Sequence, residues 1–167
     1  MGTRLRTYKV NHKGKLLSDG KGLSGQGRLT EKVMNTLQNY YGMVIRSNKN
    51  NIYGMKKGIA AIVHHCSEFL DGDNNPDNVQ RHKFCPRGAD SWCKWQQDQS
   101  TGLSTYKSKI CLPTAIRDLI MPIFSYEDLA ADSLLERCLH GLTQNVNEAF
   151  NQFGEGHLKI HLWHDEH

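Results

Sequence analysis

One short stretch, residues 81–95, constrains the fold more than any other part of the chain. It reads RHKFCPRGADSWCKW and brings together His82, Cys85, Cys93 and two of the three tryptophans. Imidazole nitrogens and thiolates are the usual ligands of structural zinc, and four of them make a closed tetrahedral site. Three such groups are present here. A metal site at this loop therefore needs one ligand from another part of the chain.

The nearest candidates for that fourth ligand are His64 and His65, near the end of a periodic helical segment just upstream. Adjacent helical positions point about 100° apart, so the periodicity leaves open which of the two faces the loop. Nine turn-prone residues, 71–79, separate this helix from the loop. Ordering the loop would cost much conformational entropy unless a cross-link, such as a shared metal ion, tied it to the helix. We expect a structural zinc ion on His65, His82, Cys85 and Cys93. The alternative is a set of ordinary buried thiols, because the spacing matches no standard zinc framework.

Apolar residues recur at three- and four-residue steps in several segments, which predicts a mainly helical fold. The clearest helix covers residues 52–69. An earlier helix begins after Thr30, a favourable N-cap, and we expect Gly42 to end it. Two more are expected between Pro113 and Pro122 and over residues 125–141. No segment alternates polar and apolar residues convincingly with a period of two, which again favours a mainly helical body.

Positive charge is concentrated at the start of the chain. Residues 1–32 hold eight Lys and Arg against two acids, whereas the whole chain has a net charge of +4. Residues 11–28 also carry five glycines, which give the backbone too much freedom to fold alone. We therefore predict a basic, Gly-rich flexible arm over residues 1–28, with a polyanion such as DNA as its partner and a merely solvated tail as the alternative. The candidate DNA-binding residues are Arg4, Arg6, Lys9, Lys13, Lys15, Lys21 and Arg28.

Cysteine usage and hydropathy bear on location. The five cysteines are an odd number, no apolar run is long enough to span a membrane, and the first ten residues lack the apolar core of a signal peptide. These features favour a reducing, intracellular location, with thiols that are free or bound to metal, and no membrane partner.

A polar segment near the end, residues 138–151, reads CLHGLTQNVNEAFN and holds one carboxylate, Glu148, among several amides. On a helix, Asn145 and Asn151 share the exposed face of Glu148 and can hydrogen-bond to it or to a phosphate. A solvated polar face is the simpler interpretation of this pattern by itself.

Three ordered blocks resemble a known family: SDGKGLSGQGRLTEKVMNTLQNYYGMVIR, HKFCPRGADSWCKW and CLHGLTQNVNEAFN. Together they are similar to the later part of the Mutator-like transposase domain of animal transposable elements. The resemblance implies a ribonuclease-H-like core that cuts and joins DNA with an Asp-Asp-Glu triad, and a largely helical insertion between the second Asp and the Glu. It implies that Glu148 is the third carboxylate, within a T-x-N-x-x-E-x-x-N segment formed here by Thr143, Asn145, Glu148 and Asn151. A nuclear location and DNA as partner follow from the same resemblance.

The two Asp residues of such a triad have no counterpart by motif. Three carboxylates are needed because hard oxygen ligands hold the two Mg²⁺ ions that activate the attacking and leaving oxygens. We therefore expect the chain to be catalytically incomplete alone, with Mg²⁺ only in a complete transposase and other transposase chains as possible partners. The expected division is residues 1–28 as the arm, 29–153 as a helical transposase fragment, and 154–167 as an unrelated His-rich tail. The alternative is a domesticated, non-catalytic, zinc-stabilised helical module that binds DNA or protein.

Overall fold

The structure, a computed structural model, describes residues 1–70, 77–108, 110–125 and 127–140. Within these ranges all regular structure is helical, and β-type pairing is limited to isolated bridges such as the parallel bridge between Ser67 and Leu112. The prediction of a mainly helical chain is confirmed. A ribonuclease-H-like core is not seen in the described ranges. None of the helices found there is long and apolar enough to cross a membrane.

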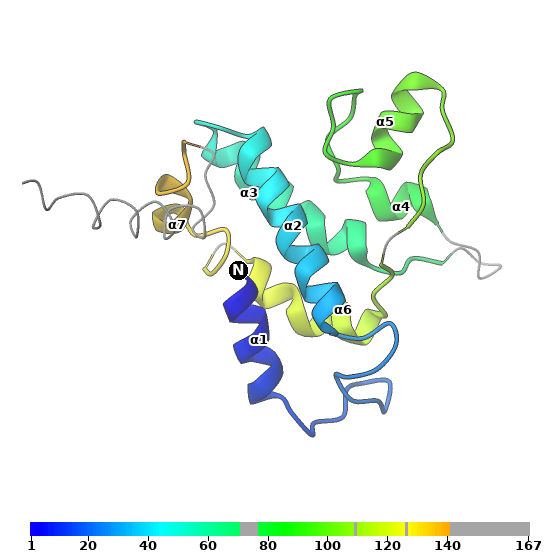
Figure 1. Cartoon of the computed structure of the whole chain (residues 1–167), viewed down its shortest axis with the longest axis vertical. Coiled ribbons are helices and arrows are strands. Elements are labelled where there is room, and N and C mark those ends of the chain that lie inside the picture. Colours follow the sequence, from blue (N-terminus) through cyan, green and yellow to red (C-terminus); the bar gives the residue numbers. More distant parts are fainter. Residues whose placement is uncertain (71–76, 109, 126, 141–167) are drawn as a thin grey trace, which may run out of the picture.

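Two long helices form the centre of the molecule, α2 (Glu31–Ser47) and α3 (Ile52–Cys66), and they pack against each other (Figure 1). As expected, Thr30 caps α2, because its hydroxyl accepts a hydrogen bond from the backbone N–H of Val33 at 3.3 Å. The expectation that Gly42 ends this helix was wrong. Burial of Val44 and Ile45 beyond it outweighs the roughly 1 kcal/mol that a glycine costs inside a helix.

The first helix, α1 (Gly2–Asn11), lies in the region where the sequence suggested a flexible arm. It packs against α2, with the Leu5 side chain fully buried and the Arg6 guanidinium hydrogen-bonded to Glu31. No apolar periodicity marks this helix, because Leu5 is its one buried large side chain. The Gly-rich segment that follows then leads to α2 through several glycines with positive φ.

The remaining helices are shorter. They are α4 (Asn78–His82), α5 (Lys94–Thr101), α6 (Thr114–Ile120), the 3₁₀ helix η1 (Met121–Phe124) and α7 (Asp132–Glu136). Pro113 immediately precedes α6, and Pro122 lies in η1, which follows α6 directly. The two prolines therefore flank this helix, as the sequence predicted from their restricted backbones. The helix expected from Ser125 begins only at Asp132. The Ser125 hydroxyl instead accepts from the Glu127 backbone N–H in a turn.

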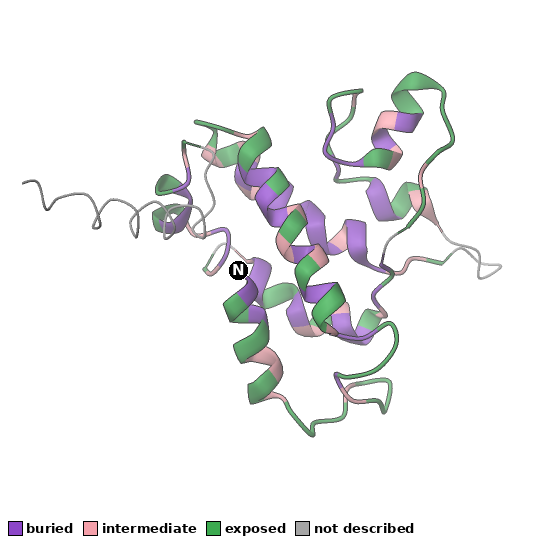
Figure 2. Ribbon diagram, viewed as in Figure 1, coloured by how far each residue is buried: buried purple, intermediate pink, exposed green. Residues whose placement is uncertain are grey.

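The apolar core lies between α2, α3, α6, η1 and α7, and Figure 2 shows buried residues on the facing sides of these elements. The close approach of α2 and α3 depends on Gly58. A Cβ at this position would lie 2.5 Å from a methyl carbon of the fully buried Val44. The segment with α4 and α5 lies to one side of this core, away from α1 (Figure 1).

Candidate metal centre

Four metal-capable side chains converge where the end of α3 meets the segment that carries α4 and α5. His65 lies in the last turn of α3, His82 ends α4, Cys85 follows in the loop, and Cys93 is the N-cap of α5. All four residues are buried, and one ligand atom from each lies within 4.8 Å of the others. The structure thus brings together the four residues proposed from the sequence as a zinc site.

The distances between these atoms match the edges of a small tetrahedron. The two Nδ1 atoms of His65 and His82 lie 3.2 Å apart. The Cys85 Sγ lies 3.5 Å from Nδ1 of His65 and 3.8 Å from Nδ1 of His82, and the Cys93 Sγ lies 3.4 Å from Nδ1 of His82. For a tetrahedral zinc ion with ordinary bond lengths, N···N edges of about 3.3 Å and N···S edges of about 3.6 Å are expected. The four groups can therefore hold a metal ion without large rearrangement.

A buried arginine fixes α4 against the end of α3. The Arg81 Nε donates to the backbone carbonyl of His65 at 2.7 Å, and its terminal nitrogen donates to the carbonyl of Ile110. Both contacts are buried, and Arg81 immediately precedes His82. The guanidinium therefore sets the position of two ligands at once.

The loop between the two cysteines is closed by its own hydrogen bonds. The Ser91 hydroxyl donates to the carbonyl of Pro86 at 2.6 Å and accepts from the Cys93 backbone N–H at 3.0 Å. Gly88, at the turn of the loop, has φ of +109°, a conformation that favours glycine. These contacts bring Cys93 back towards Cys85.

Aromatic rings surround the two histidines. His65 contacts the rings of Tyr40 and Trp92 at centroid distances of 4.5 and 5.1 Å. His82 is stacked on Trp95 at 5.1 Å and meets Tyr106 edge to face at 5.0 Å. This packing restricts the orientation of both imidazoles and keeps water from the ligand atoms.

The protonation of the free ligands suits metal binding. A hydrogen bond from Cys85, joined by hydrogen bonds from both histidines, lowers the pKa of the Cys93 thiol. The same bond, together with burial, raises the pKa of Cys85. Burial lowers the pKa of His65, so its imidazole is neutral at pH 7 and has a lone pair to offer. Metal binding would release the protons that the two thiols still carry.

The neighbouring His64 has a different environment. Its ring stacks on Phe69 at 5.5 Å and meets the edge of Phe84 at 4.6 Å, and it is outside the cluster of ligand atoms. Between the two histidines that the sequence left open, the structure therefore places His65, and not His64, at the centre.

Three of the seven cationic residues proposed for DNA binding form ion pairs. Arg4 pairs with Asp128, Arg6 with Glu31 at 3.1 Å, and Arg28 with Asp19. Arg28 is buried, which makes it a structural residue of the Gly-rich segment. The side chains of Lys9, Lys13, Lys15 and Lys21 take part in no ion pair found among the described residues. Glu148 and the other residues of its motif lie outside the described residues.

Two supporting residues were missed from the sequence, Arg81 and Asp98. The buried Asp98 carboxylate accepts from the Tyr106 backbone N–H at 2.6 Å and pairs with Lys94 at 2.9 Å. The Lys94 ammonium, together with the backbone N–H groups of Thr105 and Tyr106, lowers the pKa of Asp98 to about 2. The spacing of Lys94 and Asp98 is that of a helical ion pair and was visible in the sequence, whereas Arg81 gave no local signal.

The model of the Mutator-like transposase family matches residues 1–93. The chain belongs to the Mutator-like transposase family. This match extends over α1 to α4 and includes all four candidate ligands, with Cys93 as its last residue. The polar segment with Glu148 lies beyond it. No curated protein and no solved structure matches the chain.

Proposed function

We propose that this chain is a zinc-stabilised helical part of a DNA transposase, in which the metal has a structural role and the DNA chemistry is completed by other residues. The observation that carries this proposal is the buried cluster of His65, His82, Cys85 and Cys93 within the family match. Family membership supports DNA as the partner and a nuclear location. The helical insertion of the transposase domain is the part that we assign to residues 29–153.

Zinc is favoured over other metals by the donor set. Two thiolates and two imidazoles in a tetrahedral arrangement suit zinc, whereas Mg²⁺ and Ca²⁺ prefer carboxylates and carbonyls. Four protein ligands leave no open position for water or substrate, and burial restricts access further. A metal held here would therefore join the segment with α4 and α5 to α3 and would not take part in a reaction.

Catalytic incompleteness is supported by the distribution of carboxylates. Cleavage and joining of a phosphodiester with two Mg²⁺ ions needs several carboxylates at one place. Among the described residues, the one group of three or more metal-capable side chains is the cluster with two cysteines. We propose that Glu148 is the third carboxylate of a triad, and that the described residues do not supply its other two members.

Metal analysis tests the structural zinc directly. The chain purified under reducing conditions is expected to contain about one equivalent of zinc, and cobalt substitution should give the intense visible absorption of a tetrahedral thiolate site. Cys93→Ser should lose both properties, whereas Cys111→Ser, at an exposed cysteine, should keep them. A chain that is folded, metal-free and unable to take up cobalt would contradict the proposal.

An activity assay tests the incompleteness. The chain with Mg²⁺ or Mn²⁺ should neither cleave nor join duplex DNA, because one carboxylate leaves a metal ion mostly hydrated and poorly positioned. Glu148→Gln should not change this baseline. Nicking by the chain that disappears in Glu148→Gln would show that other acids complete a catalytic site.

The closed metal site also supports a second candidate, a domesticated non-catalytic module that binds DNA or protein. The two candidates differ in a complementation assay. A transposase part should restore strand transfer when it is joined to a chain that supplies the missing Asp residues. A domesticated module should bind its partner but restore no strand transfer.

A further inference from the structure

A groove lies directly beside the metal centre, between α3 and the loop that follows α4. Its volume is 410 Å³, and one wall carries Lys57 and Gly58 of α3. The other wall is the loop, with Lys83, Phe84 and Arg87, and the groove reaches the candidate ligand Cys85. We call these walls the basic groove.

Three exposed cations line the basic groove, and none of them pairs with an acid among the residues that the structure describes. Lys57, Lys83 and Arg87 take part in none of the ion pairs found in the described parts of the chain, and no acidic residue lines the groove. The Lys83 ammonium donates to the side-chain carbonyl of Gln80 at 3.0 Å. The Lys57 ammonium lies 5.5 Å from the ring centre of Tyr53. Neither contact neutralises the charge, so the groove is a concentrated positive site.

Exposed aromatic rings accompany these cations. The Phe84 side chain is 51% exposed although it lies in the groove wall, and Tyr53, next to Lys57, is 71% exposed. Cations beside exposed rings suit a nucleic acid, because the cations contact phosphates and the rings pack against sugars or bases. A protein partner would need a matching acidic patch, whereas a phosphodiester backbone carries a negative charge at every nucleotide.

From these observations we propose that the basic groove binds the DNA backbone, with phosphates contacted by Lys57, Lys83 and Arg87. This inference rests on the proposed function, which makes DNA the partner, and adds the residues that contact it. The sequence alone predicted that residues 1–28 contact DNA, whereas this proposal places the DNA contact at the metal-binding end of the molecule.

The position of the groove implies that metal binding and DNA binding are coupled. Lys83 directly follows the ligand His82, and Arg87 lies two residues after the ligand Cys85. The opposite wall is the rigid helix α3, whose last turn supplies His65. A metal on these ligands holds the two walls at a fixed separation. Removal of the metal should therefore weaken DNA binding as well as the fold of the loop.

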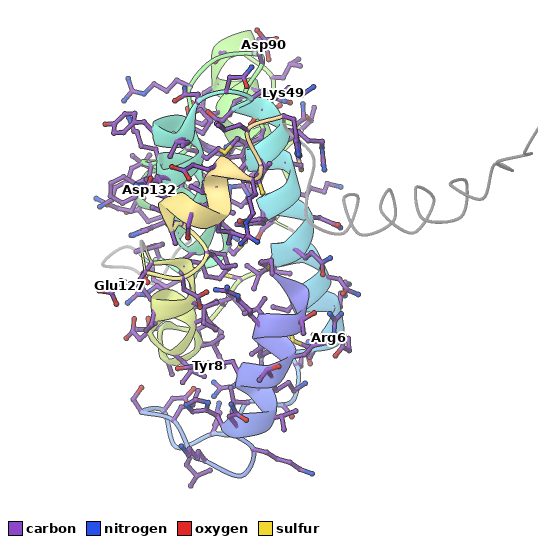
Figure 3. The ribbon with its side chains drawn as sticks, turned by 90° about the vertical axis from the view of Figure 1, so that its left-hand side faces the viewer. Arg6, Tyr8, Lys49, Asp90, Glu127 and Asp132 are labelled. Carbon is purple, nitrogen blue, oxygen red and sulfur yellow. The ribbon has the colours of Figure 1, made fainter. Side chains whose placement is uncertain are left out.

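The alternative surface at the N-terminus is well separated from this groove. Figure 3 shows Arg6 and Tyr8 of α1 towards one end of the molecule, with Lys49 and Asp90 at the other. Lys49 lies in the turn between α2 and α3, and Asp90 lies in the loop between the two cysteines. The two surfaces can thus be changed independently by mutation.

The test compares two triple variants with the same change in net charge. Lys57→Ala/Lys83→Ala/Arg87→Ala removes the cations of the basic groove, and Lys9→Ala/Lys13→Ala/Lys15→Ala removes three N-terminal cations. Binding of a fluorescent DNA duplex is measured by anisotropy over a range of salt concentrations. The groove variant should bind at least about tenfold more weakly, with the slope of log K against log salt smaller by about 2 to 3, and the N-terminal variant should change far less.

The possible results separate the inference from the function on which it rests. Equal losses in the two variants, or a larger loss in the N-terminal variant, would overturn the basic groove. If the unmodified chain takes up no cobalt, the zinc proposal fails, and the two variants still decide where DNA binds.

A second pair of variants guards against a folding defect in the triple mutant. Arg87→Glu should weaken DNA binding more than Lys15→Glu, although both reverse one exposed charge. Both proteins should keep the cobalt spectrum and the circular dichroism of the unmodified chain. Equal effects of these two reversals would again overturn the basic groove.

Discussion

The adjacent residues His64 and His65 illustrate how one helical position decides a ligand. The His65 ring meets His82 and the two cysteines, whereas His64 packs between two phenylalanine rings. We expect His65→Asn to lose the metal because it removes one of four ligands. His64→Asn should retain one equivalent. Zinc content measured after gel filtration compares them, and equal retention by both variants would show that His65 is not a ligand.

Arg81 gives a second prediction at the residue scale. Arg81→Leu would leave the buried carbonyls of His65 and Ile110 without their donor, which should lower the free energy of unfolding by about 2–4 kcal/mol. Arg137→Leu is the control, because among the described residues this exposed guanidinium donates a hydrogen bond only to the Ser133 carbonyl of α7. It should change stability by less than about 0.5 kcal/mol. Urea denaturation of the metal-loaded proteins measures both, and a similar midpoint for the two variants would contradict the role of Arg81.

At the scale of elements, the extent to which each helix could be predicted follows its apolar pattern. The stripe that includes Met55, Ile59 and Ile62 predicted α3, and all three side chains are fully buried. Helix α5 was missed because the residues it buries, Gln96 and Asp98, are polar. These side chains are held by hydrogen bonds to distant backbone, which a periodicity search does not detect.

In the metal centre, too, features that are local in sequence could be predicted, whereas features that depend on tertiary packing could not. The chemistry of His82, Cys85 and Cys93 is local in sequence, so their grouping could be proposed directly. The rotation of α3, which selects His65, and the buried contacts of Arg81 depend on tertiary packing. For the same reason the cationic residues near the start could be counted in the sequence, but their ion pairs with distant acids could not.

The crossing of α2 and α3 predicts the effect of a methyl group. Gly58→Ala should favour the helix by roughly 1 kcal/mol through propensity, but its Cβ would overlap the Val44 methyl groups. Because Val44 is fully buried and cannot move aside, we expect a net loss of about 1–3 kcal/mol.

A double-mutant cycle tests this crossing. In a Val44→Ala background, Gly58→Ala should be neutral or stabilising, because the opposing methyl groups are gone. Thermal unfolding of the four proteins gives the coupling energy. The same loss in both backgrounds would mean that the Gly58 contact with Val44 does not limit the approach of the helices.

At the scale of the whole molecule, the bundle around α2 and α3 and the segment of residues 77–108 are stabilised by different interactions. The bundle around α2 and α3 is stabilised by fully buried apolar side chains such as Leu37, Ile45 and Ile62. Residues 77–108 contribute only Cys85, Trp92 and Cys93 to the buried apolar core, and two of these are candidate metal ligands. The metal should therefore be the main constraint on this segment, but not on the bundle.

Chelation should then unfold the molecule in part. With the metal removed under reducing conditions, hydrogen exchange should accelerate in α4 and α5, whereas amides of α2 and α3 should remain protected. Because α4 and α5 contain 5 and 8 residues against 17 and 15 in α2 and α3, the loss of helical circular dichroism should be modest. Re-addition of zinc should restore exchange protection in α4 and α5. Unchanged exchange after chelation would remove the structural role of the metal, and loss of protection in α2 as well would show that the bundle cannot fold without it.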